Sequence, residues 1–272
     1  MTKRKINSIF IEEKSVKKKR NDKLIELYNF FDKVGFDNYP KIINYDEKYI
    51  NSEYIERKNV HEYSDGIELI KTVALLHSKT TSLKKINKNK YRSVYEKISG
   101  NIEYLKKYYL SFVKEIEDKE FMSPKEYLFI RHYNVFDSAL KYSQNSLKKW
   151  FKMVENKEEE RVCTVHNNLS LNHFIIGDNN YLISFDNYLV DTPVLDLYKF
   201  YKKDGYKLNY NLLLKEYNNI FPLTEEEKIL LNSLIAIPPK IEVLSNEILD
   251  CKNIRNTIIY IKNGIKIVSE NK

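Results

Sequence analysis

Polar side chains of the kind that move protons and hold cations gather in residues 162–200, which read VCTVHNNLSLNHFIIGDNNYLISFDNYLVDTPVLDLYKF. Either His166 or His173 could take up a proton near neutral pH, and Asp186 could hold a divalent metal ion. Asn168, between the two histidines, offers an amide oxygen that accepts a hydrogen bond but takes up no proton. The segment therefore contains most components of a reactive polar site, with an amide where a basic carboxylate could stand.

Short strands are expected to position these side chains. In VCTVH, FIIGD and YLISFD the apolar residues follow a period close to two, which is typical of β-strands. A GDNN turn lies between the second and the third, and its Gly177 and asparagines suit positive φ angles. We expect strands at Val162–Val165, Phe174–Ile176 and Leu182–Phe185.

The first 58 residues mix strand and helix signals. SIFIEE predicts a short strand, and KIINYD with YINSEYIE predicts a hairpin around DEK. NDKLIELYNFFDKVG predicts an amphipathic helix over Asn21–Val34, with Asn21 or Asp22 as its N-cap and Gly35 at its end. We therefore expect residues 1–58 to form a small αβ lobe.

The remainder, residues 59–272, has mostly helical patterns. Gly and Pro number six each, which favours long helices and few tight turns. LTEEEKILLNSLIAI begins with Thr224 and Glu227 at the spacing of a capping box. Further helices are expected in SDGIELIKTVALLHSKT, over Tyr91–Asp118, as two helices within Ser123–Glu155, and in PPKIEVLSNEIL and NIRNTIIYIKNGIKIV.

Composition argues against several classes of protein. No run of 18 apolar residues and no signal peptide is recognisable, so a cytoplasmic protein without a membrane span is expected. Cys163 and Cys251 lack metal-ligand spacing. The net charge of +8 includes the run KSVKKKR, residues 14–20, which either contacts phosphate or an acidic surface or is a solvated helix entry. No zinc-finger spacing or RNP-like motif supports nucleic-acid binding.

Four parts of the chain together resemble the aminoglycoside phosphotransferase and choline kinase-like superfamily, and within it most of all the spore-coat CotS-type branch. TVALLHSKT is similar to a helix at the start of the family's large lobe, VHNNLSLNHFII to its catalytic loop, and YLISFDNYLVDTPVLDL to its metal-binding strand and the residues after it. The N-terminal strand and helix are similar to the third strand and following helix of its small lobe. The resemblance implies an α+β, protein kinase-like two-lobed fold, with a small, truncated N-terminal αβ lobe and a large, mostly helical C-terminal lobe.

The resemblance also assigns roles to residues of the loop, and two of them depart from the family pattern. The family's catalytic base falls on Asn168, next to a His166 whose role is structural. Its magnesium-ligating Asn falls on His173, and imidazole is a poorer ligand than oxygen for this hard cation.

The second metal position depends on the alignment. Counting back from Asp196 without a gap places it on Ser184, whereas a two-residue deletion would place it on Asp186. The gapless count is favoured because SFDNYLVDTPVLDL then matches throughout. Asp196 is implied to bond the backbone of the catalytic loop, or else is an ordinary acid at a helix N-terminus.

The phosphate-binding part departs from the family as well. The family covers phosphates with a Gly-rich hairpin, but the first glycine here is Gly35, and too few residues precede SIFIEE to build that hairpin. Lys14 is the candidate phosphate-contacting lysine, with Glu26 on the following helix as its ion-pair partner.

Two functional hypotheses follow. The favoured one is a catalytically degenerate pseudokinase that acts by binding a protein partner, needs no cofactor, and by resemblance serves in spore-coat assembly. Phosphoryl transfer needs a metal clamp, a phosphate cradle and a positioned hydroxyl together, and all are altered here. The alternative is an ATP- and magnesium-dependent phosphotransferase acting on a hydroxylated amine or sugar. In it Asp186 holds the metal, His166 or His173 takes the proton, and Lys14 holds phosphate.

Overall fold

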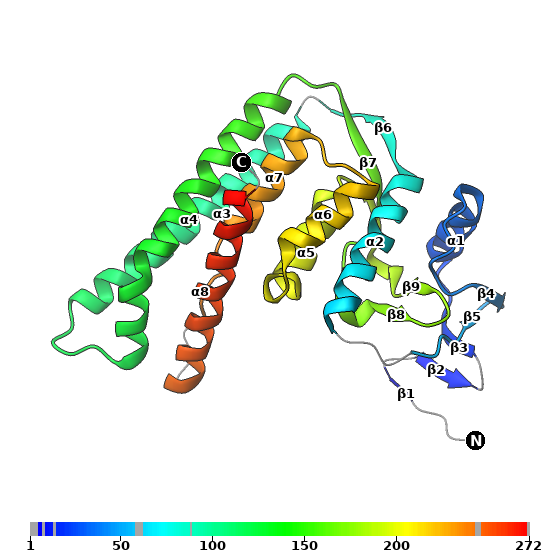
Figure 1. Cartoon of the computed structure of the whole chain (residues 1–272), viewed down its shortest axis with the longest axis horizontal. Helices are drawn as coiled ribbons and strands as arrows, with labels where there is room; N and C mark the ends of the chain where they lie inside the picture. Colours follow the sequence, from blue (N-terminus) through cyan, green and yellow to red (C-terminus); the bar gives the residue numbers. More distant parts are fainter. Residues whose placement is uncertain are drawn as a thin grey trace. The chain divides into compact units, whose positions relative to one another are not determined.

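The structure is a computed structural model that describes residues 5–6, 9–12, 15–57, 62–87, 89–242 and 246–270 (Figure 1). The chain forms two compact units. The first combines Met1–Ser82, Arg161–Phe200 and Leu212–Pro222, and the second combines Leu83–Glu160, Tyr201–Asn211 and Leu223–Lys272. The expected division into lobes at residue 58 stays a prediction.

The first unit contains a five-stranded antiparallel sheet with the order β1-β2-β3-β5-β4. Its strands are β1 (Lys5–Ile6), β2 (Ile9–Glu12), β3 (Ser15–Lys19), β4 (Ile42–Tyr45) and β5 (Tyr49–Glu53). Ile9–Glu12 of SIFIEE form β2, and β4 and β5 form the predicted hairpin. Ser15–Lys19 of the lysine run form a strand, however, and not a helix entry. The strand directly before the first helix is therefore β3, one strand later than the sequence prediction placed it.

Helix α1 (Asp22–Val34) begins and ends where the sequence predicts. Asn21 is its N-cap with an extended backbone, although the side chain makes no capping hydrogen bond. Gly35 follows the last turn in the left-handed conformation, with φ 69°, which costs little for a residue without a Cβ. The face that α1 buries consists of Leu24, Ile25, Leu27, Tyr28 and Phe31.

The polar segment adds two strand pairs to the first unit. β7 (Glu159–Val165) pairs antiparallel with β10 (Leu189–Asp191), and β8 (Phe174–Ile176) pairs antiparallel with β9 (Asn180–Leu182). Helix α2 (Glu62–Thr80) packs against β8, β9 and α1. The core of this unit therefore holds the segment 162–200 against α2.

Two local predictions about this segment are wrong. The strand predicted at Leu182–Phe185 ends at Leu182, because the backbone turns left-handed at Ser184 and a 3₁₀ turn follows at Phe185–Asn187. The GDNN turn also needs no positive φ angle. In the described part of the chain, positive φ occurs at Gly35, Asn167 and Ser184.

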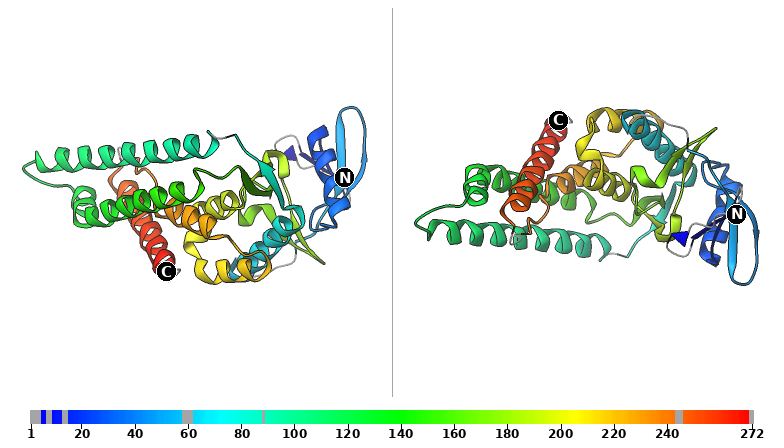
Figure 2. Two further views of the ribbon diagram at one scale, coloured as in Figure 1. Left: turned by 90° about the horizontal axis from the view of Figure 1, so that it is seen from above. Right: turned by 90° about the horizontal axis from the view of Figure 1, so that it is seen from below.

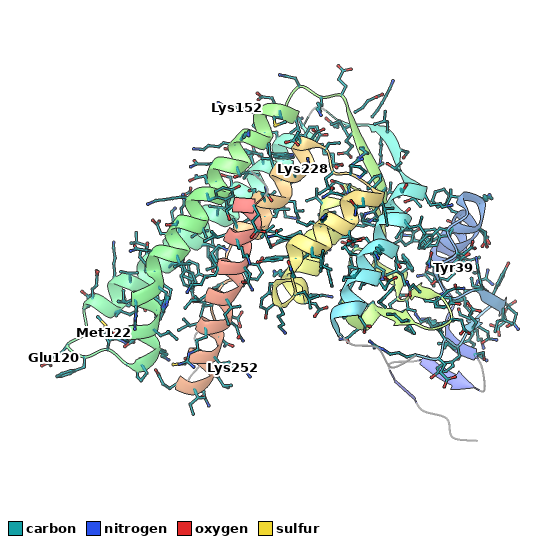
Figure 3. All side chains as sticks on the ribbon, in the orientation of Figure 1. Tyr39, Glu120, Met122, Lys152, Lys228 and Lys252 are labelled. Carbon is teal, nitrogen blue, oxygen red and sulfur yellow. The ribbon has the colours of Figure 1, made fainter. Side chains whose placement is uncertain are left out.

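The second unit is helical. Helix α4 (Pro124–Val154) packs against α3 (Lys90–Glu117), α7 (Glu225–Ala236) and α8 (Glu247–Glu270). Figure 2 shows α3 and α4 side by side in opposite directions, and Glu120 and Met122 lie at the turn between them (Figure 3). Three further elements, together with β7, contain residues of both units: β6 (Ser82–Lys85), α5 (Val194–Lys203) and α6 (Tyr210–Ile220).

The predicted capping box is present at α7, where Glu227 accepts from the backbone N–H of Thr224 at 2.9 Å and the Thr224 hydroxyl accepts in return. Two other helix predictions are wrong. Residues 124–154 form one helix instead of two, since no Gly or Pro interrupts them after Pro124. PPKIEVLSNEIL is not helical from its start, because consecutive prolines lack N–H groups, and α8 begins at Glu247.

No helix in the described ranges is both long enough and apolar enough to cross a membrane.

Candidate functional site

A buried carboxylate fixes the loop that follows β7. Asp196, in the first turn of α5, accepts the backbone N–H of His166 on Oδ2 at 2.6 Å and that of Asn167 on Oδ1 at 2.7 Å. On α2, His77 brings Nε2 to 3.2 Å from the same Oδ2, and its Nδ1 lies 2.8 Å from the hydroxyl of Tyr217. Burial alone would raise the pKa of Asp196, but its interactions with His77, and in smaller part with His166, outweigh burial and lower that pKa. The interior therefore holds an ionised group that orders the loop.

Two imidazole rings brace the backbone of Asn168. The Nδ1 atom of His166 accepts the Asn168 N–H at 3.3 Å, so its proton lies on Nε2, which donates to the carbonyl of Ile183 at 2.7 Å. His173 donates from Nδ1 to the carbonyl of Asn168 at 2.7 Å. The two rings stack with centroids 5.6 Å apart. Both histidines thus use ring nitrogens to hold the loop and the end of the neighbouring strand.

Asn167 adopts a left-handed backbone with φ 62°, a conformation that asparagine tolerates better than most residues. Its side-chain amide donates to the carbonyl of Asn187 at 2.7 Å. The ammonium of Lys199 donates to its backbone carbonyl at 2.9 Å and also bonds its side-chain oxygen. This turn directs the backbone from the end of β7 into Asn168.

Ser184 stands at the second left-handed position, with φ 66° and ψ 50°. Non-glycine residues in this region of the Ramachandran plot are uncommon and cluster at functional sites. The next side chain, Phe185, is buried with its ring centroid 4.8 Å from that of His166. The left-handed conformation of Ser184 is one that Asp or Asn adopts more readily than Ser.

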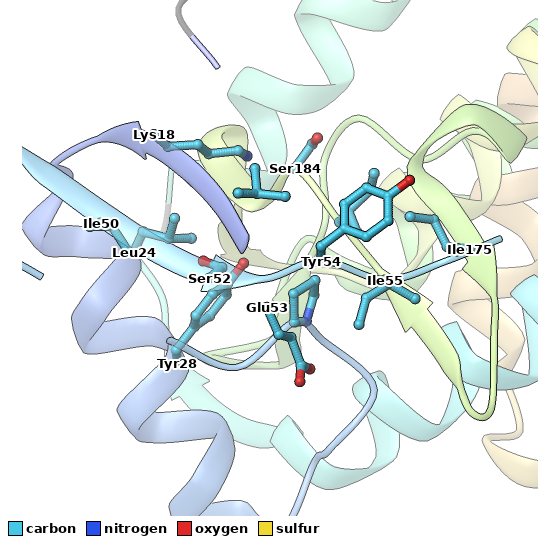
Figure 4. A pocket seen from close by; sticks show the side chains of 13 residues that line it. Lys18, Leu24, Tyr28, Ile50, Ser52, Glu53, Tyr54, Ile55, Ile175 and Ser184 are labelled. Atoms are coloured by element: carbon cyan, nitrogen blue, oxygen red, sulfur yellow. The ribbon is translucent and has the colours of Figure 1, made fainter. Parts of the chain in front are cut away.

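Ser184 lines a cavity of about 210 Å³ (Figure 4). Its walls come from β3, α1, β5 and the residues after it, and from Ile175 and Ile183 of the β8–β9 region. The lining is mostly apolar: Val16, Leu24, Tyr28, Pro40, Ile50, Ile55, Ile175 and Ile183. Among its polar members, Glu53 is turned to the backbone of Lys41, whose N–H it accepts at 3.0 Å.

Lys18 supplies the cation of the cavity lining. It comes from β3, on the same face as Val16, and its ammonium lies 3.7 Å from Oδ2 of Asp186. Figure 4 shows the Lys18 side chain reaching toward Ser184. The Asp186 side chain is half exposed and that of Lys18 is 25% exposed. Burial, together with the charge of Asp186, raises the pKa of Tyr28, which faces the same cavity.

The structure therefore brings some of the predicted site residues together. Asn168 and His173 lie in the same loop, and Ser184 lines the cavity. Asp186 lies beside the ammonium of Lys18. Glu26 is exposed on α1 and is absent from the cavity lining. Lys14 lies outside the described residues.

The sequence prediction missed Lys18 because it assigned the wrong strand to the position before α1. The alternation in SVKKK was the available signal, since Val16 and Lys18 must then share a face.

The donor set does not fit a magnesium site. This ion prefers carboxylate and carbonyl oxygens in an octahedral arrangement, usually from one or two protein carboxylates and substrate phosphates. Asn168 and Ser184 offer neutral oxygens, and the Nδ1 of His173 already donates to a backbone carbonyl. Asp186, the remaining carboxylate among the predicted ligands, lies next to an ammonium.

Comparison with solved structures identifies the fold. An aminoglycoside phosphotransferase from Alicyclobacillus acidocaldarius superposes with a TM-score of 0.75 at 8% sequence identity, over 99% of this chain and 91% of that one. Two other structures are more distant. A glucosamine kinase has a TM-score of 0.47 and 9% identity over 96% of this chain and 70% of that one. A spectinomycin phosphotransferase bound to ADP and spectinomycin has a TM-score of 0.46 and 13% identity over 96% of this chain and 89% of that one.

No family model matches the sequence, and no curated protein matches it. The chain has the α+β kinase-like fold of the aminoglycoside phosphotransferase structure, with a small N-terminal sheet and a large helical part, as the sequence predicts.

Proposed function

We propose that this protein uses a kinase-like fold for binding and does not transfer phosphoryl groups. The observation that carries the proposal is Ser184. It occupies a strained left-handed position at the cavity wall, and the family resemblance assigns a metal-binding carboxylate to this position. A serine hydroxyl is neutral at physiological pH and contributes little to holding a divalent cation.

The state of the loop supports the same proposal. The contacts that determine its shape are complete, from the Asp196 carboxylate to the two histidine rings. The residue at the expected base position, Asn168, has no group that takes up a proton near neutral pH. A loop that keeps its architecture without reacting groups is well suited to presenting a stable binding surface.

The partner in this proposal is another protein. A role in spore-coat assembly, which the CotS-type resemblance implies, belongs to the same proposal and would be checked by following a tagged protein through sporulation of the source cell. In this proposal the protein needs neither ATP nor magnesium, because the described residues at the predicted metal positions fit a magnesium ion poorly.

One observation favours the alternative, an ATP-dependent small-molecule phosphotransferase. Lys18 and Asp186 bring a cation and a carboxylate to one edge of the cavity. In active phosphotransferases such groups contact phosphate and metal.

The deciding experiment measures ATP hydrolysis and phosphoryl transfer to a panel of hydroxylated amines and sugars. The assay compares wild type with Asn168→Ala and with the matched control Asn172→Ala, which alters an exposed residue of the same loop. The comparison requires that the three proteins have equal melting temperatures. We expect all three to give background rates. Turnover in wild type and Asn172→Ala that disappears in Asn168→Ala would refute the binding-only proposal.

A further inference from the structure

The cavity beside Ser184 has the properties of a small-molecule site in its own right. We propose that it holds, without a metal ion, a flat apolar ring bearing one anionic group, and that this group replaces Asp186 on Lys18. The inference deepens the binding function proposed above and rests on it, since a site released from phosphoryl transfer can retain a ligand of another kind.

The size of the cavity limits the ligand to one or two rings. Drug-sized ligands occupy pockets of about 300–1,000 Å³, and this cavity has about 210 Å³. Aliphatic side chains stand on two of its walls, with Val16 and Ile50 from the N-terminal sheet and Ile175 and Ile183 from the β8–β9 region. Walls of branched aliphatic groups favour an apolar ring over a sugar or a polyamine. Tyr54 lies at the same cavity with its side chain half exposed, where it can cover an inserted ring (Figure 4).

The charge at the cavity favours a single anion. Lys18 is the cation among the described lining residues, and its present partner sits at 3.7 Å, beyond the 2.7–3.2 Å range of a hydrogen bond. A half-exposed carboxylate at this distance stabilises the lysine only weakly. A ligand carboxylate could approach Lys18 to hydrogen-bonding distance while Asp186 turns to water. A polyphosphate without metal would instead bring several negative charges to one ammonium with Asp186 nearby.

Calorimetric titration with 2-naphthoate tests the proposal, with its neutral analogue 2-naphthamide as the matched ligand and EDTA in every buffer. Naphthoate should bind at least about tenfold more tightly than naphthamide, the size expected of one charge-assisted hydrogen bond. Lys18→Met should abolish this preference and leave naphthamide affinity within about twofold. Lys19→Met removes the same charge from the neighbouring, exposed position on the opposite face of β3 and should change neither affinity.

A second variant works in the opposite direction. Asp186→Asn removes the competing carboxylate and should tighten naphthoate binding by about threefold to tenfold without affecting naphthamide. This arm keeps the proposal testable even if Lys18→Met is poorly folded.

Equal affinity for the two ligands, no binding of either at millimolar concentration, or equal losses in Lys18→Met and Lys19→Met would each overturn the inference. Such a result would leave the binding-only function intact, since that proposal fails through phosphoryl transfer by the wild type.

Discussion

At the scale of single residues, we expect Asp196 to contribute most to the stability of the site. Its two oxygens accept two backbone N–H groups and lie against His77 in a fully buried position. In Asp196→Asn an NH2 group, which cannot accept a hydrogen bond, replaces one carboxylate oxygen. One backbone N–H is then left unsatisfied, and the contact with His77 loses its negative charge. We expect the free energy of unfolding, measured by urea titration, to fall by about 3–5 kcal/mol.

Asp186→Asn is the matched control for this substitution. It makes the same chemical change at a half-exposed carboxylate, and we expect less than about 0.5 kcal/mol from it. Equal losses from the two variants would contradict the role given to Asp196.

The lowered pKa of Asp196 predicts a specific dependence of stability on pH. A carboxyl group whose pKa is lower in the folded state stabilises the fold fully above its unfolded pKa, about 3.9. That stabilisation is lost as the pH falls through the folded pKa, which lies below this value. The difference in unfolding free energy between wild type and Asp196→Asn should therefore be present in full at pH 5 and shrink below about pH 4. A difference that stays constant down to pH 3 would show that the carboxylate charge is not the cause.

At the scale of elements, two glycines should respond to the same substitution with opposite signs. Gly35 ends α1 at φ 69°, where an added Cβ is strained, so Gly35→Ala should destabilise the protein by about 1–2 kcal/mol. Gly100 lies inside α3 with open space where a Cβ would stand, so Gly100→Ala should stabilise it by about 0.5–1 kcal/mol. Thermal unfolding followed by circular dichroism measures both changes. Shifts of the same sign would argue against the left-handed end of α1.

The elements also show where sequence patterns suffice and where they do not. The amphipathic α1 and the capping box of α7 were predictable because each signal is local. The single helix α4 was predicted as two helices, and the contact that holds Ser143 within it is not local in the sequence. The Ser143 hydroxyl is buried and donates to the carbonyl of Ser233 at 2.8 Å, a partner 90 residues away. β3 was missed because four consecutive basic residues mask the alternation that places Lys18 at the cavity.

At the scale of the whole molecule, the fold was predictable from widely spaced motifs, but the cavity was not. Residues 162–200 and the helix that carries His77 resemble a known family closely enough to imply a kinase-like fold. The cavity depends on β3, β5 and the β8–β9 region meeting in space, and no single segment encodes that meeting. The family resemblance predicted that Asn168 stands at the base position, whereas the role of the His173 ring as a backbone brace required the structure.

Nucleotide binding is the property that tests the whole site at once. Because the donor set fits magnesium poorly, millimolar ATP with magnesium should shift the melting temperature by less than about one degree. A ligand at 100 times its dissociation constant would add about 2.7 kcal/mol, which corresponds to a shift of several degrees for a chain of this size. Scanning fluorimetry with ATP, with and without magnesium, measures this, and ADP and magnesium alone serve as controls. A clear shift that requires both ATP and magnesium would contradict the prediction.

Introducing the metal ligands that the family resemblance assigns should produce magnesium-dependent ATP binding without rapid phosphoryl transfer. In the triple variant Asn168→Asp, His173→Asn and Ser184→Asp, two carboxylates and an amide oxygen return to the positions that the family pattern assigns to them. Ser184→Asp also suits the left-handed backbone, where Asp is more frequent than Ser. We expect calorimetry to detect magnesium-dependent ATP binding in this variant, while turnover stays low because metal binding alone does not position a substrate hydroxyl for phosphoryl transfer.

Asn168→Asp alone is the control for the triple variant. It adds a negative charge to a half-buried position of the loop and supplies no metal ion to balance it, so it should lower the melting temperature and restore no activity. The introduced carboxylate would have the expected base chemistry, but both metal positions would keep their present side chains. If the single substitution restored phosphoryl transfer, the missing carboxylate at position 168 would be the only defect of the site, and Ser184 and His173 would have to be functional as they stand.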